Sequence, residues 1–404
     1  PLYCIMLLLG SHITCSGQEL WTLERCIEHG LRNNPDIERG RLDIEINDNL
    51  LLLSKTEVLP SLFLHITHSP HSEKCISPYF NSSLTLFGGL GKYFKIKASE
   101  ISSKISRHQL DAIRIDLILS IIQSYLEALM AQEMIKISKN NLCSIEEQYL
   151  KSKVWFDNGK TTHSTLLELD AQRSAERVNL IIAQNRLALE KIELAHLINC
   201  TPCQGMILDS SLCHKPLRMV SVEDADSIFQ SAVKLPSVEI CRERVELSKY
   251  ITRGAQSALS PTISLDATYD IRNNIGSYGI TLNIPIFNHY QHIINVRNTK
   301  LEWQKEEISL QQELKELYRE VFSTIQNVVS SHQAYIAASD YLEHTTEIFY
   351  QMQNKFEMGI TGITDYNISK NNMIKAQIEK IKAKYQYILE CEILEIYEGK
   401  KGQW

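Results

Sequence analysis

The chain has 404 residues, of which 44% are hydrophobic, 22% charged and 8% aromatic, a composition typical of a folded rather than a disordered protein. Its 42 lysines and arginines are outnumbered by 48 aspartates and glutamates, and the net charge of −6 argues against a nucleic-acid-binding protein, which needs a basic surface. No apolar run approaches about 18 residues, so we expect no membrane-spanning helix, and carriers or channels built from such helices are excluded.

The first segment, residues 1–17, has the character of a secretory signal whose beginning is missing. Residues Leu2–Gly10 are mostly apolar, and a cluster of small residues ends at Gly17, so we expect cleavage after Gly17 and export. A buried first strand is the alternative interpretation. Lipid attachment at Cys15 is disfavoured, because His12 stands where a lipoprotein signal needs a small aliphatic residue.

The rest of the chain contains two copies of one module. Pro35 and Pro60 recur 201 positions later as Pro236 and Pro261, and the pattern Phe-x-x-Gly-x-Thr occurs at both 156–161 and 356–361. This period is far too long for a solenoid repeat, so it indicates a duplication. We expect a first repeat at 18–200, a linker rich in proline and glycine at 201–221, and a second repeat at 222–404.

Long helices dominate both repeats. No proline lies between Pro78 and Pro202, and beyond Gly91 only Gly159 interrupts that stretch before Gly205. The apolar residues step by three and four, which is typical of a coiled-coil-like stripe, as in Ile115, Ile118, Ile122, Tyr125 and Leu129. We therefore predict a helix over Trp21–Thr56, long helices over 98–158 and 161–198 in the first repeat, and long helices over 291–358 and 363–398 in the second.

Each repeat also contains two segments with the alternation of half-buried strands, at 58–68 and 79–87 and at 262–270 and 278–287. The alternation places polar side chains on one face, which we assign to the inside of a barrel: Thr262, Ser264, Asp266, Thr281 and Asn283. A β-sandwich is the alternative, but it needs about seven strands. Four strands do not close a barrel either, since the smallest have eight, so the outer strands must pair with other subunits.

Chemistry-bearing motifs are missing. Among ten cysteines only three cluster, at Cys200, Cys203 and Cys213 beside His214, and a second ligand pair at zinc-finger spacing is absent. A local disulfide or free thiols are favoured there, and an exposed loop is favoured over a metal site at His65, His68 and His71. The stretch Gly88–Lys92 resembles the end of a phosphate loop without its first glycine. We expect no enzyme activity, no cofactor and no metal.

The order of several motifs resembles the TolC family of bacterial outer-membrane efflux and secretion channels. The motifs are Leu20–Pro35, Val58–Leu62, Ser83–Lys92, Phe156–Gln172, Gly279–Phe287 and Phe356–Asn372. The resemblance implies a mainly α protein with membrane β-strands: a homotrimer whose twelve strands form one β-barrel, extended by an α-helical periplasmic tunnel. It also implies docking to a periplasmic adaptor and an inner-membrane pump, and contact with outer-membrane lipid.

The resemblance assigns the two helix breaks to the periplasmic tip, where the adaptor binds and the pore closes. The adaptor-contact residues it implies are Asn158, Gly159, Lys160, Thr161, Met358, Gly359, Ile360 and Thr361. The pore gate it implies consists of Phe356, Asp365 and Ile368. Phe356 replaces a tyrosine that ties the family's gate by hydrogen bonds, Ile368 replaces a second pore aspartate, and Thr165 replaces an aspartate of the first repeat. We therefore expect this gate to be held by packing.

Asp365 has two interpretations. Three copies of its carboxylate near a symmetry axis would concentrate cations. Alternatively, Asp365 is the N-cap of the last long helix.

Three functions are compatible with these features. The first is a passive exit channel for small molecules or metal ions in a tripartite efflux system. The second is the exit duct of a type I protein secretion system, which shares the fold. The third is a non-channel coiled-coil protein at the cell surface.

Overall fold

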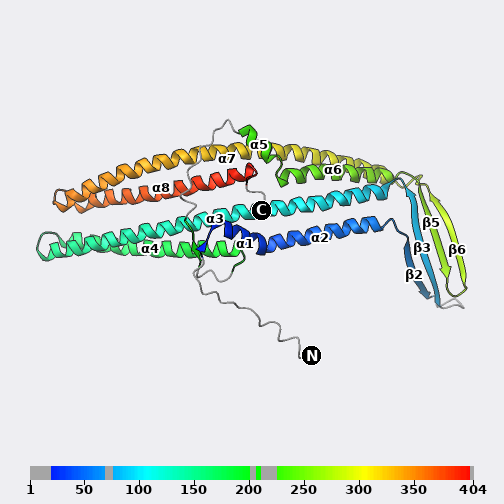
Figure 1. Cartoon of the computed structure of the whole chain (residues 1–404), viewed down its shortest axis with the longest axis horizontal. Helices are drawn as coiled ribbons and strands as arrows, with labels where there is room; N and C mark the ends of the chain where they lie inside the picture. The colour runs from blue at the N-terminus through cyan, green and yellow to red at the C-terminus, as the bar shows by residue number, and fades with distance from the viewer. Residues whose placement is uncertain (1–19, 69–75, 201–205, 211–224, 401–404) are drawn as a thin grey trace, which may run out of the picture.

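A computed structural model describes residues 20–68, 76–200, 206–210 and 225–400. The molecule is long and narrow, with a sheet at one end and the turns of two helical hairpins at the other (Figure 1). The expected signal remnant, most of the expected linker, and Cys203, Cys213 and His71 lie outside the described residues.

The chain contains the same order of elements twice, as the sequence predicted. The first copy consists of β1 (Leu20–Trp21), α1 (Leu23–Asn33), α2 (Pro35–Thr56), β2 (Ser61–His68), β3 (Ile76–Gly88), α3 (Gly91–Asp157) and α4 (His163–Leu197). The second consists of β4 (Ile207–Leu208), α5 (Ala225–Ala232), α6 (Pro236–Ser257), β5 (Thr262–Asp270), β6 (Ile275–Asn283), α7 (Gln291–Glu357) and α8 (Ile363–Tyr397).

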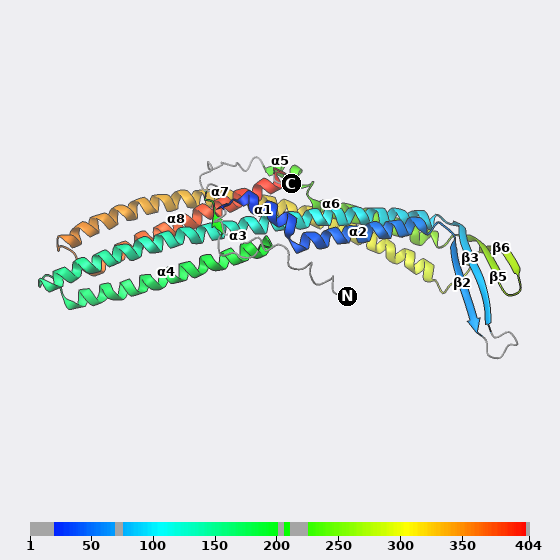
Figure 2. The same ribbon diagram turned by 60° about the horizontal axis from the view of Figure 1, so that its bottom comes forward.

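The helices form one elongated layer. In the half near the tip, α3 contacts both α4 and α8, and α8 contacts α7, which gives the lateral order α4, α3, α8, α7. In the half near the sheet, α2 and α6 replace α4 and α8, in the order α2, α3, α6, α7. The long helices α3 and α7 each have 67 residues, about 100 Å at 1.5 Å per residue, and therefore run through both halves (Figure 2). Of the helices in the described part of the chain, none is long and apolar enough to cross a bilayer.

Two helix predictions were wrong in detail. The expected helix Trp21–Thr56 is two helices, because Pro35 opens α2 and the Asn34 side chain caps it by accepting a hydrogen bond from the Asp36 N–H at 2.8 Å. The helix expected from residue 98 begins at Gly91, directly after its N-cap Leu90, which has a left-handed backbone with φ +66°.

The four long strands form one antiparallel sheet in the order β2, β3, β5, β6. The predicted strand 278–287 was wrong at both ends: β6 begins at Ile275 and ends at Asn283, because Pro285 has no N–H to donate to a ladder. Likewise β2 begins after Pro60 rather than at residue 58, and β3 extends the predicted 79–87 to 76–88.

The middle of the molecule holds a small core that the sequence did not predict. Strand β1 pairs in parallel with β4, so that residues from the start of each copy lie side by side. The hydroxyl of Tyr125 in α3 lies 3.0 Å from the carbonyl oxygen of Trp21 and 2.8 Å from that of Asp209. Tyr125 is 1% exposed. It therefore joins the longest helix of the first copy to β1 and to the residue that follows β4.

Replacing Tyr125 with phenylalanine should lower the free energy of unfolding by about 1–2 kcal/mol, because the change removes a buried hydroxyl and leaves the packing intact. The measurement is thermal unfolding of the purified protein followed by circular dichroism. The control is Tyr318→Phe. Tyr318 is 45% exposed, so this substitution should change the free energy of unfolding by less than about 0.5 kcal/mol. Equal effects of the two substitutions would show that the Tyr125 hydroxyl does not contribute to stability and that only its ring does.

Candidate functional site: the helical tip and the polar strand face

Both long hairpins reverse at the tip through the same kind of turn. In the first, the Gly159 N–H donates to the Phe156 carbonyl at 2.9 Å and the Lys160 N–H donates to the Trp155 carbonyl at 2.8 Å. This is a Schellman motif, which requires a left-handed residue after the helix end, and Gly159 supplies it with φ +71°.

The second turn repeats this geometry 200 positions later. The Gly359 N–H donates to the Phe356 carbonyl and the Ile360 N–H to the Lys355 carbonyl, both at 2.9 Å, and Gly359 has φ +73°. A Cβ at either glycine would meet no atom within 4 Å, so the backbone angle and not crowding requires glycine here. Of the predicted adaptor-contact residues, Thr161 and Thr361 are half-buried and the others are exposed: Asn158, Gly159, Lys160, Met358, Gly359 and Ile360.

Asp365 is exposed in the first turn of α8. Its carboxylate accepts a hydrogen bond from the Thr361 hydroxyl at 3.1 Å. The alternative that Asp365 is the N-cap was wrong, because Gly362 occupies that position. The equivalent residue of the first copy, Thr165, donates its backbone N–H to the side chain of the N-cap Thr162. The carboxylate of Asp365 therefore lies near the positive end of α8 and remains open to solvent.

Phe356 lies inside an aromatic cluster rather than on an open surface. Its ring centroid is 5.2 Å from that of Tyr366 in α8 and 6.3 Å from that of Trp155 in α3. Phe349 of α7 contacts Tyr366 at 5.6 Å, and burial raises the pKa of the Tyr366 hydroxyl to about 12. Packing of these aromatic rings, rather than an ion pair among them, joins α3, α7 and α8 at this level. Sequence reasoning missed Trp155 and Tyr366, since nothing in the local pattern shows that three helices meet at this level.

The third predicted gate residue, Ile368, is 55% exposed. Its neighbour Asn367 is 7% exposed and donates from Nδ2 to the Glu168 carboxylate of α4 at 3.3 Å. Asn367 thus links the two hairpins, a contact that the sequence did not predict.

The strand residues assigned to the inside of a barrel share one face of the sheet. The register pairs Thr262 with Asn283 and Ser264 with Thr281 across β5 and β6, and directly paired residues point to the same side. The carboxylate of Asp266 accepts hydrogen bonds from the hydroxyls of Ser83 at 2.7 Å and Ser264 at 2.9 Å. These contacts place all five predicted residues in one polar row.

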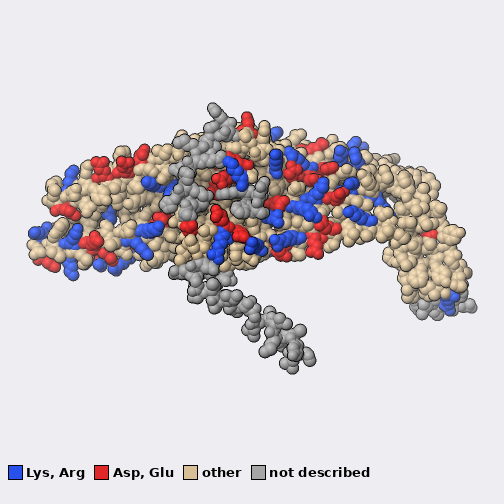
Figure 3. Space-filling model, in the orientation of Figure 1, with Lys and Arg blue, Asp and Glu red and all other residues tan. Residues whose placement is uncertain are grey.

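The opposite face is apolar on every strand. Its exposed side chains include Leu62, Leu64, Ile66, Phe80, Leu265, Tyr269, Tyr278, Ile280 and Leu282. Figure 3 shows charged side chains spread over the helices and almost none over the sheet. An exposed apolar band on a sheet with a polar reverse face fits strands that contact lipid on one side and water on the other.

A sequence model of the family described as "Outer membrane efflux protein" matches residues 76–199 and 235–394. The chain belongs to this family. Membership confirms the resemblance noted in the sequence and the outer-membrane location.

Two curated relatives and one solved structure illustrate the range of this family. The chain is 22% identical to the alkaline protease secretion protein AprF of Pseudomonas aeruginosa over 299 residues, a match that covers 70% of this chain and 61% of AprF. It is 19% identical to the outer membrane efflux protein BepC of Brucella suis, over 95% of this chain and 86% of BepC. The crystal structure of the Campylobacter jejuni CmeC outer membrane channel superposes with a TM-score of 0.79 at 17% identity, over 95% of this chain and 86% of CmeC.

Within the described residues, no group of three or more histidine, cysteine, aspartate or glutamate side chains is arranged to hold a metal ion. Cys26, Cys143 and Cys241 are free thiols.

Proposed function

We propose that three copies of the chain form a passive outer-membrane exit channel of a tripartite efflux system, expelling small molecules or metal ions. The polar strand face would line a twelve-stranded barrel, and the helices would line a periplasmic tunnel that ends at the tip.

The observation that carries this proposal is that, among the residues that the structure describes, the two lateral edges of the molecule are not covered by another strand or helix. At the sheet, β2 and β6 each pair with one strand only. In the helical layer, the outer helices α4 and α7 expose large apolar side chains, among them Leu167, Val178, Ile181, Ile182, Leu189 and Ile192 of α4 and Ile336, Tyr341, Ile348 and Tyr350 of α7. Because the two edges differ, copies would join head to tail and close into a ring. Four strands per chain then give twelve in a trimer.

The same surfaces support the proposed partners. Met358 and Ile360 are 75% and 70% exposed at the tip, where apolar side chains favour a protein contact with a periplasmic adaptor, which would connect the channel to an inner-membrane pump. The apolar strand face would contact outer-membrane lipid.

Native mass spectrometry of protein extracted from outer membranes in mild detergent tests the assembly. We expect a trimer, because an open four-stranded sheet with an apolar face is not stable alone. A monomer, or a protein recovered without detergent, would refute the channel and return the cell-surface coiled coil as the better interpretation.

A second candidate is the exit duct of a type I protein secretion system, which the similarity to the secretion protein AprF favours. Deleting the gene distinguishes the two. Increased sensitivity to small toxic compounds with unchanged secreted proteins supports efflux, and loss of a secreted protein with unchanged sensitivity supports secretion.

A further inference from the structure

A buried lysine near the tip forms no ion pair with any residue that the structure describes. Lys370 of α8 is 5% exposed, and its Nζ is buried and donates no hydrogen bond to any residue that the structure describes. No carboxylate of the described residues lies within ion-pair distance of the Lys370 Nζ, although Glu176 of α4 acts on it electrostatically. Burial lowers the pKa of the Lys370 ammonium. An unpaired buried ammonium is costly, so a ligand that supplies the missing negative charge would be strongly favoured at this position.

Lys370 lines a cavity of about 480 Å³ between α3, α7 and α8. This volume is within the range of small-molecule sites, roughly 300–1,000 Å³. The lining contains no acidic residue. Besides Lys370 it has the polar side chains Asn140, Asn141, Ser144, Gln377 and Lys380 and the apolar side chains Ile137, Leu342, Phe349, Met373 and Ile381.

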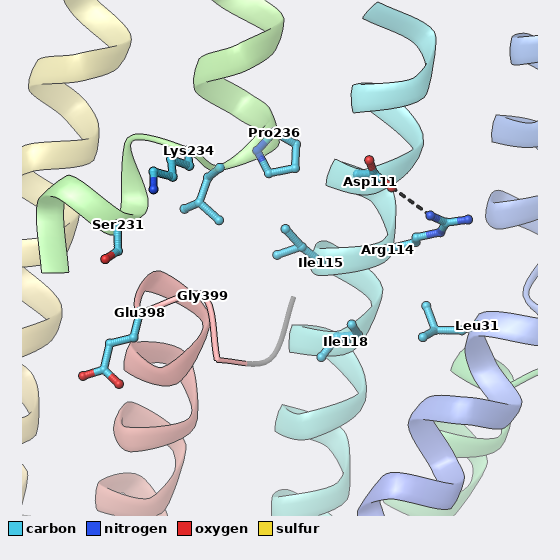
Figure 4. Close-up of a pocket in the computed structure, with 11 residues that line it drawn as sticks. Leu31, Asp111, Arg114, Ile115, Ile118, Ser231, Lys234, Pro236, Glu398 and Gly399 are labelled. Atoms are coloured by element: carbon cyan, nitrogen blue, oxygen red, sulfur yellow. Dashed lines mark hydrogen bonds and ion pairs between the residues drawn. The ribbon is translucent and has the colours of Figure 1, made fainter. Parts of the chain in front are cut away.

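The charge of this cavity distinguishes it from the hollow of about 550 Å³ at the middle of the molecule. Figure 4 shows that the middle hollow presents both signs of charge: Asp111 pairs with Arg114 at 2.8 Å, and Glu398 and Lys234 line it as well. The middle hollow therefore has no net preference for an anion, whereas the cavity at Lys370 has two ammonium groups and no carboxylate.

We propose that the cavity at Lys370 binds an amphiphilic organic anion, a carboxylate or sulfonate carried on an apolar body. The anionic group would accept hydrogen bonds from Lys370 and from the amide and hydroxyl groups of α3 and α8, and the apolar body would pack against Phe349, Leu342 and Met373. Because the lining comes from three helices, the ligand would stabilise their packed arrangement.

Equilibrium dialysis of radiolabelled phenylbutyrate tests the site, with the full-length protein in nanodiscs of zwitterionic phosphatidylcholine. We expect saturable binding, and binding about tenfold or more weaker for the neutral amide of the same compound. Lys370→Met should weaken phenylbutyrate binding by at least about tenfold while preserving volume. Lys375→Met is the matched control, since Lys375 is exposed on the same helix and does not line the cavity.

A second variant, Ser144→Leu, keeps the charge and fills the cavity, and it should also abolish saturable binding. Circular dichroism of each variant establishes that it is folded. Absence of saturable binding to the parent protein, equal binding of the amide, or unchanged binding by Lys370→Met would each overturn the proposal. Transport is not part of this measurement, so failure of the exit-channel proposal and failure of the anion site are distinguishable.

Discussion

Replacing Phe356 with alanine should increase the fraction of time that the pore is open. The Phe356 ring packs on Tyr366 and Trp155, so its loss removes contacts among α7, α8 and α3 at the tip. A fully buried phenylalanine contributes about 3–5 kcal/mol, and for this half-buried ring we expect a loss of about 1–3 kcal/mol from the packed state. If that packing exists only in the closed tip, opening becomes about tenfold more favourable for each 1.4 kcal/mol lost.

Single-channel recording in planar bilayers measures this effect directly. The duplication offers a matched control, because Phe156 occupies the equivalent position of the first copy and is 36% exposed. Among the aromatic rings of the described residues, Phe156 contacts only that of His163. Phe156→Ala should leave the open fraction near that of the parent protein. Equal effects of the two substitutions would show that the aromatic cluster does not hold the tip closed.

The long helices could be predicted because their causes are local. Proline and glycine are absent over long stretches, and apolar residues recur every three or four positions. The bounds of α7 were therefore predicted closely, whereas α3 begins at Gly91, before the predicted residue 98. The errors lie at the ends, where competing local chemistry decides. Asn34 and Pro35 divide the first predicted helix, and Pro285 ends β6 early.

The contacts between the two copies could not be predicted in the same way. The β1–β4 pairing consists of two-residue strands far apart in the chain, too short for any periodicity. The cluster of Trp155, Phe356 and Tyr366 joins three helices whose relative rotation is set by packing along their whole length. In the sequence, Lys370 looks like an ordinary surface lysine of a charged helix. Only the three-dimensional structure reveals that its side chain is buried.

The polar face of the strands could be predicted in part. Alternation alone assigned Thr262, Ser264 and Asp266 to one face, because the side-chain period of a strand is two. The hydroxyl of Ser83, which donates to Asp266, required the register between β3 and β5, and a single sequence does not provide that register.

Replacing Asp365 with asparagine should weaken block of the pore by divalent cations by about tenfold, equivalent to about 1.4 kcal/mol. In the proposed trimer, three carboxylates would face a narrow axis, and a ring of like charges raises the local cation concentration. Asparagine has the same size and still accepts the hydrogen bond that the Thr361 hydroxyl donates at 3.1 Å, so the turn should keep its structure.

The measurement is the inhibition constant of magnesium for single-channel current, with the cation added on the side of the tip. Asp157→Asn is the matched control, since Asp157 is also exposed and ends α3 two residues before Gly159. It removes the same charge from the same end of the molecule but not from the first turn of α8. If magnesium blocks the Asp365→Asn channel as strongly as the parent channel, Asp365 does not face the pore. Its carboxylate then only stabilises the N-terminus of α8, an effect of about 0.3–1 kcal/mol on helix stability.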